Sequence, residues 1–246
     1  MLKARRLGAV LSIELDRPDR GNALSAELVE RLIAGVEQAS SDASLHTMVL
    51  AGSGRHFCTG FDLADLEQSS DGDLLLRFAR IEQLLSMLWQ APMRTVCVAH
   101  GRTWGAGADL LVACDRRLAV DGASFRFPGP AFGIVLGSRR LAERIGVDRA
   151  REVLSGGLEL DTASARAAGL VQEICPAEGL QERLEALAVA PLPDRDTVRA
   201  LRQATRDDRG DADLASLVRS ASRPGLKARL LAYQDMRRAA RASSPQ

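Results

Sequence analysis

The 246-residue sequence lacks several features that would identify a partner immediately. No apolar run approaches the roughly 20 residues of a membrane-spanning helix, so we expect no membrane segment. Basic residues do not gather into a stripe with interleaved aromatics, since 33 Lys and Arg are mixed with 32 Asp and Glu and only 4% of residues are aromatic. We therefore expect no nucleic-acid partner.

Cysteine is scarce and is not spaced as metal ligands are. The four cysteines are Cys58, Cys97, Cys114 and Cys175, and three of them lie in apolar runs. The N-terminal residues do not have the pattern of a signal segment. These observations predict reduced thiols, no bound metal and a cytoplasmic location.

The pattern that is present is that of an α/β protein. The length allows one large α/β domain with a helical appendage, and no internal repeat is evident. From residue 191 the composition shifts to alternating charged and apolar residues, so we assign 1–190 to the core and 191–246 to a helical C-terminal region. Apolar patterning predicts strands at 7–15, 48–52, 95–99, 116–120 and 170–174, and helices at 27–36, 74–88, 141–145, 148–154 and 162–169.

The segment 92–115 carries the strongest functional signal. A β-favouring run at 95–99 leads into a glycine-rich turn at 100–107 and then into an apolar helix. The first turn of a helix has unpaired N–H groups and partial positive charge. We therefore predict that the Ala106 N–H is a donor to a carbonyl oxygen that gains charge. Asp109 lies one turn further in; the helix dipole favours its ionised form, which predicts a base, although such a residue can also serve only to complement the dipole.

A second glycine-rich passage, 53–66, has the same predicted order of strand, loop and helix. Gly60 would let the chain turn so that the Phe61 N–H points into a pocket. Asp62 and Asp65 fit the N-terminus of the predicted helix. His56 has no acidic residue near it in sequence, so we interpret it as a loop residue.

Four segments together carry a family resemblance. They are RPDRGNALS (17–25), VLAGSGRHFCTGFDLADL (49–66), VCVAHGRTWGAGADLLVACDRRLA (96–119) and LSGGLELDTASARAAGLVQEICP (154–176). In this order they resemble the crotonase (enoyl-CoA hydratase/isomerase) superfamily from about Leu7 to Pro176. The resemblance implies an α/β fold with a crotonase-type ββα spiral core and a helical C-terminal oligomerisation region, assembled as a homotrimer or a dimer of trimers. It also implies acyl-CoA thioester substrates and no metal or added cofactor, with coenzyme A entering as part of the substrate.

The resemblance also implies roles for individual residues. Phe61 N–H and Ala106 N–H would form the oxyanion hole for the thioester carbonyl, and Asp109 would be the catalytic carboxylate. The residues implied in substrate binding are Arg20, Ala23, Phe61, Asp62, Leu63, Ala64, Gly105 and Ala106.

The sequence departs from the family pattern at the two positions where family hydratases carry glutamates. Asp109 stands at the first and is shorter by about 1.5 Å, while Gly129 stands at the second. Hydration needs both an acid and a base, and the sequence offers one shortened carboxylate for the two roles. Three hypotheses for the function therefore stay open. They are an enoyl-CoA hydratase/isomerase-type enzyme, a decarboxylase using the oxyanion hole without paired glutamates, and a non-catalytic acyl-CoA-binding protein. The family's dehalogenases are excluded because 133–138 contains no aspartate, and Glu143 or Asp121 are candidates to replace the missing carboxylate.

Overall fold

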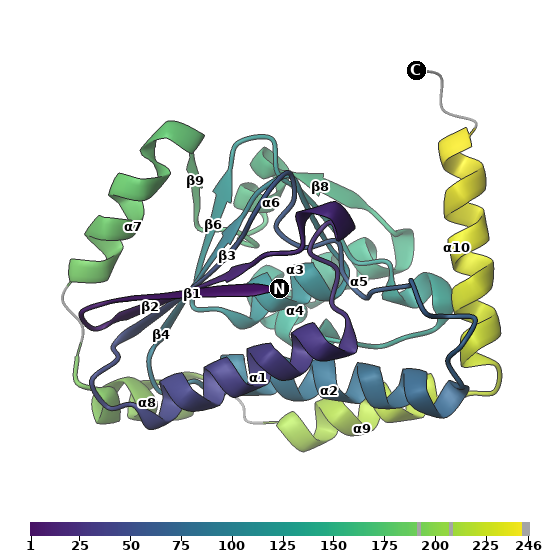
Figure 1. The fold of residues 1–246 in the computed structure, drawn as a ribbon, viewed down its shortest axis with the longest axis horizontal. Coiled ribbons are helices and arrows are strands. Elements are labelled where there is room, and N and C mark those ends of the chain that lie inside the picture. Colours follow the sequence, from purple (N-terminus) through teal and green to yellow (C-terminus); the bar gives the residue numbers. More distant parts are fainter. Residues whose placement is uncertain (191–192, 207–208, 243–246) are drawn as a thin grey trace.

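The computed structural model describes residues 1–190, 193–206 and 209–242, and within them two sheets form the framework (Figure 1). A six-stranded sheet has the order β1-β2-β3-β4-β6-β9, and a three-stranded sheet has the order β5-β7-β8. β1 and β2 form an antiparallel hairpin, and the other neighbours in the large sheet are parallel. The strands are β1 (Leu2–Leu7), β2 (Val10–Leu15), β3 (Thr47–Gly52), β4 (Arg94–Ala99), β5 (Arg102–Trp104), β6 (Arg116–Val120), β7 (Ser124–Arg126), β8 (Glu159–Asp161) and β9 (Glu173–Cys175).

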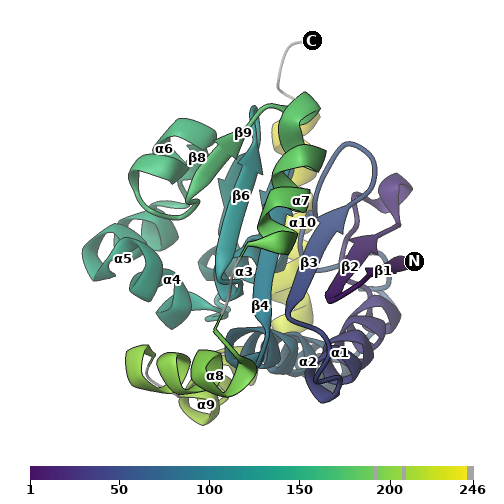
Figure 2. The same ribbon diagram turned by 90° about the vertical axis from the view of Figure 1, so that its left-hand side faces the viewer.

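Helices cover both faces of the large sheet (Figure 2). On one face lie α1 (Ala26–Ser41), α2 (Asp71–Gln90) and the wholly buried α3 (Ala106–Ala113), whose apolar residues join the main core. On the other face, α7 (Leu180–Val189) packs on outward-facing residues of β3, β4 and β6. The remaining helices are α4 (Ser138–Ile145), α5 (Val147–Gly156), α6 (Thr162–Ala167), α8 (Arg195–Thr205), α9 (Gly210–Ala221) and α10 (Leu226–Ala242), with short 3-10 turns at Pro18–Arg20, Gly129–Phe132 and Ala177–Gly179.

The mixed α/β fold and the helical C-terminal region are as predicted, but several local assignments were wrong. The expected strand at 7–15 is a hairpin that turns at Gly8, where φ is +58°. No helix follows Gly60, because the segment 62–70 is irregular, with turns at residues 64–68. A short strand, β5, interrupts the predicted turn at 100–107, and the predicted strand at 170–174 is displaced to Glu173–Cys175. Residues 191–192, 207–208 and 243–246 of the predicted C-terminal region lie outside the described residues.

Asn22 ties together the two loops that lead to the predicted substrate site. It is fully buried and has a left-handed backbone, with φ at 54°, a conformation that asparagine tolerates better than most residues. Its Nδ2 donates to the carbonyl oxygens of Ser53 (2.9 Å) and His56 (2.8 Å), and its Oδ1 accepts from the Arg17 N–H (2.8 Å). The turn at 17–25 is thus held against the loop at 53–57.

Replacing Asn22 with alanine is expected to lower the free energy of unfolding by about 2–4 kcal/mol, because the three backbone groups that bond to its side chain lose their partner. Urea unfolding followed by circular dichroism measures the change. Asn22→Gly is the matched variant, since glycine accepts a positive φ and loses only the side-chain bonds. We expect it to recover a small part of the loss, and a cost under about 1 kcal/mol for Asn22→Ala would contradict the role of these bonds.

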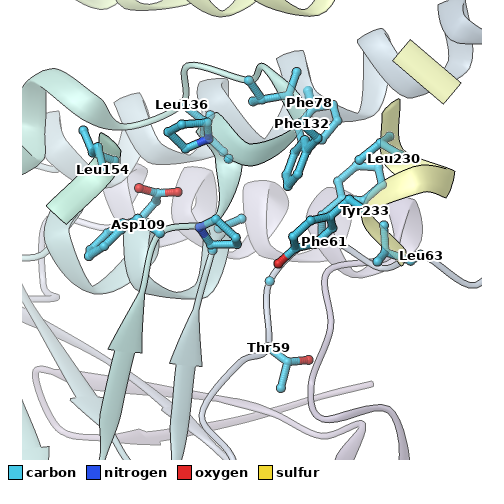
Figure 3. A pocket seen from close by; sticks show the side chains of 18 of the residues that line it. Thr59, Phe61, Leu63, Phe78, Asp109, Phe132, Leu136, Leu154, Leu230 and Tyr233 are labelled. Atoms are coloured by element: carbon cyan, nitrogen blue, oxygen red, sulfur yellow. The ribbon is translucent and has the colours of Figure 1, made fainter. Parts of the chain in front are cut away.

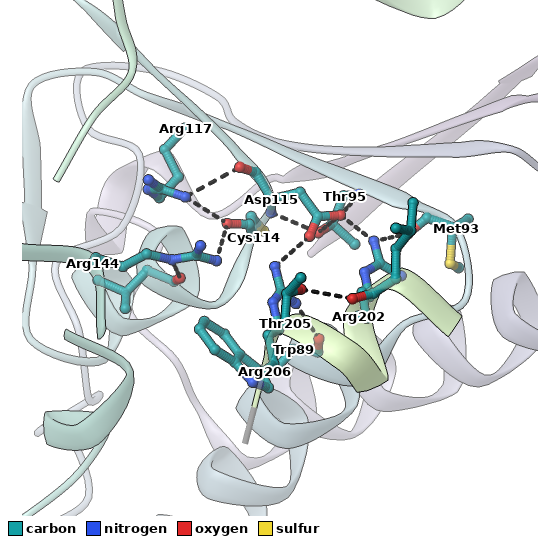
Figure 4. A network of polar contacts seen from close by, with 12 residues as sticks. Trp89, Met93, Thr95, Cys114, Asp115, Arg117, Arg144, Arg202, Thr205 and Arg206 are labelled. Carbon is teal, nitrogen blue, oxygen red and sulfur yellow. Dashed lines mark hydrogen bonds and ion pairs between the residues drawn. The ribbon is translucent and has the colours of Figure 1, made fainter. Parts of the chain in front are cut away.

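Arginine side chains anchor the C-terminal end of α3 (Figure 4). Arg117 donates to the carbonyl oxygens of Cys114 (3.2 Å) and Asp115 (3.1 Å), and Arg144 donates to those of Val112 (3.2 Å) and Cys114 (3.0 Å). These carbonyls have no partner within the helix, and the arginines also carry the charge that a helix C-terminus favours.

Asp115 connects this end of α3 to α8. Its carboxylate pairs with Arg202 and with Arg206 (2.6 Å) and accepts from the Thr95 N–H (2.8 Å). Arg206 also lies over the ring of Trp89, 4.2 Å from the centroid. Arginines at the C-terminal end of α8 therefore dock on the core by sharing one carboxylate.

Replacing Asp115 with asparagine is expected to lower the free energy of unfolding at pH 7 by about 2–4 kcal/mol, because Arg202 and Arg206 lose their counter-charge. Burial raises the pKa of Asp115, but the two arginines lower it more, so the net pKa lies below the ordinary value of 3.8. A carboxylate with a depressed pKa stabilises the fold above its unfolded-state pKa and loses that effect as the pH falls through its folded-state pKa. Chemical unfolding of both proteins from pH 7 to pH 3 should show the difference shrinking below about pH 4; a constant difference would contradict this.

Candidate active site

The two glycine-rich loops meet at the start of α3. A Cβ built on Gly60 would lie 2.8 Å from the Trp104 carbonyl oxygen and 3.4 Å from the Ala106 nitrogen. Gly60 also has a φ of +95°, and Gly105, which precedes α3, has a φ of +54°. Both positions therefore require glycine, one for the close approach and both for the backbone conformation.

The two predicted donors, the Phe61 N–H and the Ala106 N–H, directly follow the glycines Gly60 and Gly105 that make this contact. The Leu24 N–H donates to the Gly60 carbonyl (2.8 Å), and the Asp62 N–H donates to the Leu24 carbonyl (3.2 Å). Because peptide groups alternate along an extended segment, the Phe61 N–H points away from Leu24. Ala106 is the first residue of α3, so its N–H has no carbonyl acceptor within the helix.

An apolar cavity of about 60 Å³ adjoins these groups (Figure 3). Asp109 lies at one end beside Leu136 and Leu154, and an aromatic group that includes Phe132 and Tyr233 lies at the other. Among the described residues that line the cavity, Asp109 supplies the single carboxyl group and Arg237 the single cation. The other lining residues are Thr59, Gly60, Phe61, Leu63, Phe78, Gly105, Ala106, Phe127, Pro128, Gly129, Pro130, Ile134 and Leu230.

Asp109 is almost completely buried, with 5% of its surface exposed. Its Oδ1 has no hydrogen-bond partner among the described residues. Burial raises the pKa of Asp109 well above its usual range and the charge of Glu82 raises it further, while Arg140 opposes both. Desolvation therefore opposes the ionised form that the helix dipole favours, and the role of Asp109 as a base stays a prediction.

The substrate-binding residues implied by the resemblance divide into two groups. Phe61, Leu63, Gly105 and Ala106 line the cavity together with Asp109. Arg20, Ala23, Asp62 and Ala64 are not among its lining residues, so their contact with coenzyme A stays a prediction.

Contacts of the Asp62 carboxylate fix the conformation of the loop that follows Phe61. Its carboxylate pairs with Arg17 (3.0 Å) and accepts from the Ala64 N–H (3.0 Å). Beside it, the ring of Phe61 stacks on Phe78 with centroids 4.3 Å apart, and the Arg77 guanidinium covers Phe61 at 4.2 Å. Asp62 therefore does not begin a helix, as was predicted. It lies in a loop whose contacts hold Phe61 in place.

Neither candidate for the missing carboxylate is among the residues that line the cavity. Glu143 pairs with Arg139, and Asp121 accepts from the Gly122 N–H (3.0 Å). His56, interpreted as a loop residue, accepts from the Arg102 N–H (3.1 Å). Within the described part of the chain, no helix is long and apolar enough to span a membrane, and no three His, Cys, Asp or Glu side chains cluster as metal ligands.

Glu82 is a buried charged residue that the sequence analysis missed. It is 1% exposed and lies on α2 between the buried Phe78 and Leu85. A signal was present, since those neighbours place Glu82 on the apolar face of the predicted helix. A carboxylate at such a position needs a buried partner, which marks it for attention.

The mainly parallel sheet, the buried helix that starts between two glycine loops, and the cavity at that start define a crotonase-type α/β protein. The chain belongs to the enoyl-CoA hydratase/isomerase family, whose sequence model matches residues 5–218. The predicted family is confirmed.

Individual relatives agree with this assignment. The Mycobacterium tuberculosis protein named probable enoyl-CoA hydratase echA6 is 34% identical over 177 residues, covering 71% of this chain and 70% of the relative. The 2,3-dehydroadipyl-CoA hydratase of Escherichia coli is 31% identical over 206 residues, covering 79% and 78%. A crystal structure from Bordetella parapertussis, assigned to the enoyl-CoA hydratase/isomerase group, is 41% identical, covers 99% of both chains and has a TM-score of 0.90.

Proposed function

We propose that this chain is an acyl-CoA-processing enzyme that stabilises a thioester enolate, with Phe61 N–H and Ala106 N–H as oxyanion donors. Asp109 is the single side chain that transfers a proton. The observation that carries the proposal is the position of one buried carboxyl group in an apolar cavity that also borders both donor residues.

The chemistry follows from where charge develops. When a proton leaves the carbon beside a thioester carbonyl, negative charge moves to the carbonyl oxygen. Fixed N–H donors stabilise that oxygen more than they stabilise the neutral ground state. A protonated Asp109 is suited to return a proton to the enolate, and its ionised form takes one in the reverse direction.

This arrangement favours proton transfer, and hence double-bond isomerisation, over hydration. Hydration needs a second group to activate water, and the cavity has Gly129 where family hydratases carry the second glutamate. Decarboxylation is the second candidate, because loss of carbon dioxide leaves an enolate that an acid must protonate. Burial raises the pKa of Asp109, which suits its carboxyl group to supply that proton.

Binding of the substrate completes the proposal. Leu63 and Gly105 would contact the thioester along the cavity wall, and Arg20, Ala23, Asp62 and Ala64 would follow the coenzyme A portion outside it. We also propose that the chain assembles as a homotrimer or a dimer of trimers.

Proton exchange at C2 tests enolate formation whatever the net reaction. Butyryl-CoA is incubated with the protein in D2O and deuterium at C2 is followed by mass spectrometry, beside turnover of 2-enoyl, 3-enoyl and malonyl thioesters. We expect exchange well above the uncatalysed rate, with isomerisation or decarboxylation as the net reaction. Tight thioester binding with neither exchange nor turnover would overturn the proposal in favour of a non-catalytic binding protein.

A further inference from the structure

Tyr233 brings a hydroxyl group to the aromatic end of the cavity. It is the single tyrosine of the chain, lies on α10 and has 8% of its surface exposed. Figure 3 shows its side chain reaching into the cavity beside Phe61, with the hydroxyl oxygen turned toward the loop that carries Thr59. No hydrogen bond joins this hydroxyl to any described residue. Because buried polar groups are nearly always paired, we expect the partner to come from a molecule bound in the cavity.

Contacts at two places fix the position of the Tyr233 ring. Its centroid lies 4.9 Å from that of the Phe132 ring, and the Phe132 carbonyl oxygen accepts from Arg229 Nε of α10 (3.0 Å). The start of α10 is held by Asp71 of α2, whose carboxylate accepts from the Lys227 N–H (2.7 Å). The hydroxyl is therefore held in place before a substrate binds, as a preorganised hydrogen-bond donor must be.

The cavity is small enough for this hydroxyl and the predicted backbone donors to face the same few atoms. Its volume is about 60 Å³, and one water-sized group needs about 10–15 Å³. It therefore holds roughly four to six non-hydrogen atoms of a thioester, namely the carbonyl group, the sulfur and the first carbons of the acyl chain. Phe61 and Ala106, whose N–H groups are the predicted donors, line the cavity together with Tyr233.

The thioester oxygen is the acceptor that suits this hydroxyl best. A simple acyl thioester brings two acceptors into the cavity, the carbonyl oxygen and the sulfur, and sulfur accepts hydrogen bonds weakly. The amide groups of the coenzyme A arm lie further from the reacting carbon and, under the proposed function, outside the cavity. When an enolate forms, its oxygen gains negative charge, and a hydrogen bond to a charged acceptor is roughly twice as strong as one to a neutral acceptor.

We propose that the Tyr233 hydroxyl is a third donor to the thioester oxygen, beside the N–H groups of Phe61 and Ala106, and hence a catalytic residue. The inference rests on the proposed function, because it concerns the enolate oxygen of that same site. Tyr233 keeps its proton and donates only a hydrogen bond, while Asp109 exchanges the proton with carbon. Helix α10 would therefore contribute to catalysis and not only to packing.

Tyr233→Phe tests the inference because it removes the hydroxyl and keeps the ring. We expect C2 exchange at saturating butyryl-CoA to fall by about 10–100-fold, with the Kd for that thioester within about threefold of wild type. Asp235→Asn is the matched control on the same helix, because Asp235 is exposed and pairs with Arg238 (3.5 Å). It should keep wild-type exchange. Weaker binding with an unchanged rate at saturation would assign the hydroxyl to ground-state binding and overturn the inference.

A second measurement reads the hydroxyl without turnover. Because Tyr233 is the single tyrosine, protein labelled with 13C at tyrosine Cζ gives one NMR signal. The signal is recorded for the free protein, with butyryl-CoA and with acetoacetyl-CoA, whose acidic C2 favours an enolate. We expect it to move downfield on binding, and further with acetoacetyl-CoA, since donation to a charged oxygen is stronger.

A Cζ signal that both ligands leave unchanged, although calorimetry shows that they bind, overturns the inference. So does exchange in Tyr233→Phe within about twofold of wild type. Failure of the proposed function would appear differently, as absence of C2 exchange in the wild type itself. The two failures are therefore distinguishable.

Discussion

Replacing Asp109 with asparagine is expected to reduce C2 exchange and any isomerisation at least ~100-fold, with little change in thioester binding. The amide has nearly the shape of the protonated carboxyl group, so the buried site is preserved. It does not exchange a proton with carbon, so only the chemical step is lost. Steady-state kinetics and isothermal titration with a saturated thioester separate the two effects.

Asp121→Asn is the control, because that aspartate lies outside the cavity and bonds the Gly122 N–H. We expect it to retain wild-type rates. Decarboxylation of a malonyl thioester that is indifferent to Asp109→Asn would assign catalysis to the backbone donors alone. Exchange that survives the substitution within about tenfold would contradict the role of Asp109.

Ala106→Pro is expected to lower C2 exchange by about 10²–10³-fold, equivalent to roughly 3 kcal/mol of transition-state stabilisation. Proline removes one N–H group, and the first position of a helix tolerates it because that N–H has no partner within the helix. Gly105, the residue before it, has no Cβ to clash with the proline ring. The rate constant for exchange at saturating butyryl-CoA measures the loss.

Ala26→Pro is the matched control, since Ala26 is the first residue of α1 and follows the capping residue Ser25. It makes the same substitution at the same helical position, outside the cavity. Both variants should melt within a few degrees of wild type, and only Ala106→Pro should lose exchange. Equal exchange in the two variants would exclude the Ala106 N–H as a donor.

The sequence was sufficient to locate the central elements because their signals are local. Glycines between an apolar strand and an apolar segment predicted both loops, and apolar patterning at 27–36 predicted the middle of α1, whose cap is Ser25, with its Oγ accepting from the Leu28 N–H at 3.3 Å. The irregular segment that follows Phe61, with turns at 64–68, was mistaken for a helix because its conformation depends on contacts with distant residues. Arg17 and Arg77 hold Asp62 from elements 45 and 15 residues away.

The raised pKa of Asp109 could not be predicted from the sequence for the same reason. Its position at a helix start predicts ionisation, and only the tertiary structure buries the carboxyl group and places Glu82 near it. Burial of a polar group is a property of the assembled core, so local sequence predicts it poorly. The side-chain pattern of α2 placed Glu82 on the apolar face but did not identify the partner, Arg140, which lies 58 residues away.

The anchoring of α3 has a consequence for how its first N–H group behaves during a reaction. The helix has eight residues and spans about 12 Å, and its far end is fixed by Arg117 and Arg144. A donor on a loosely held helix would drift toward the oxygen as charge grows and would bind the ground state and the transition state with similar strength. Here the C-terminal end of the helix is fixed. We therefore expect the Ala106 N–H to keep one position whether or not the bound oxygen carries charge. Under the proposed function, residues that never contact a substrate would thereby determine how selectively the site responds to the enolate.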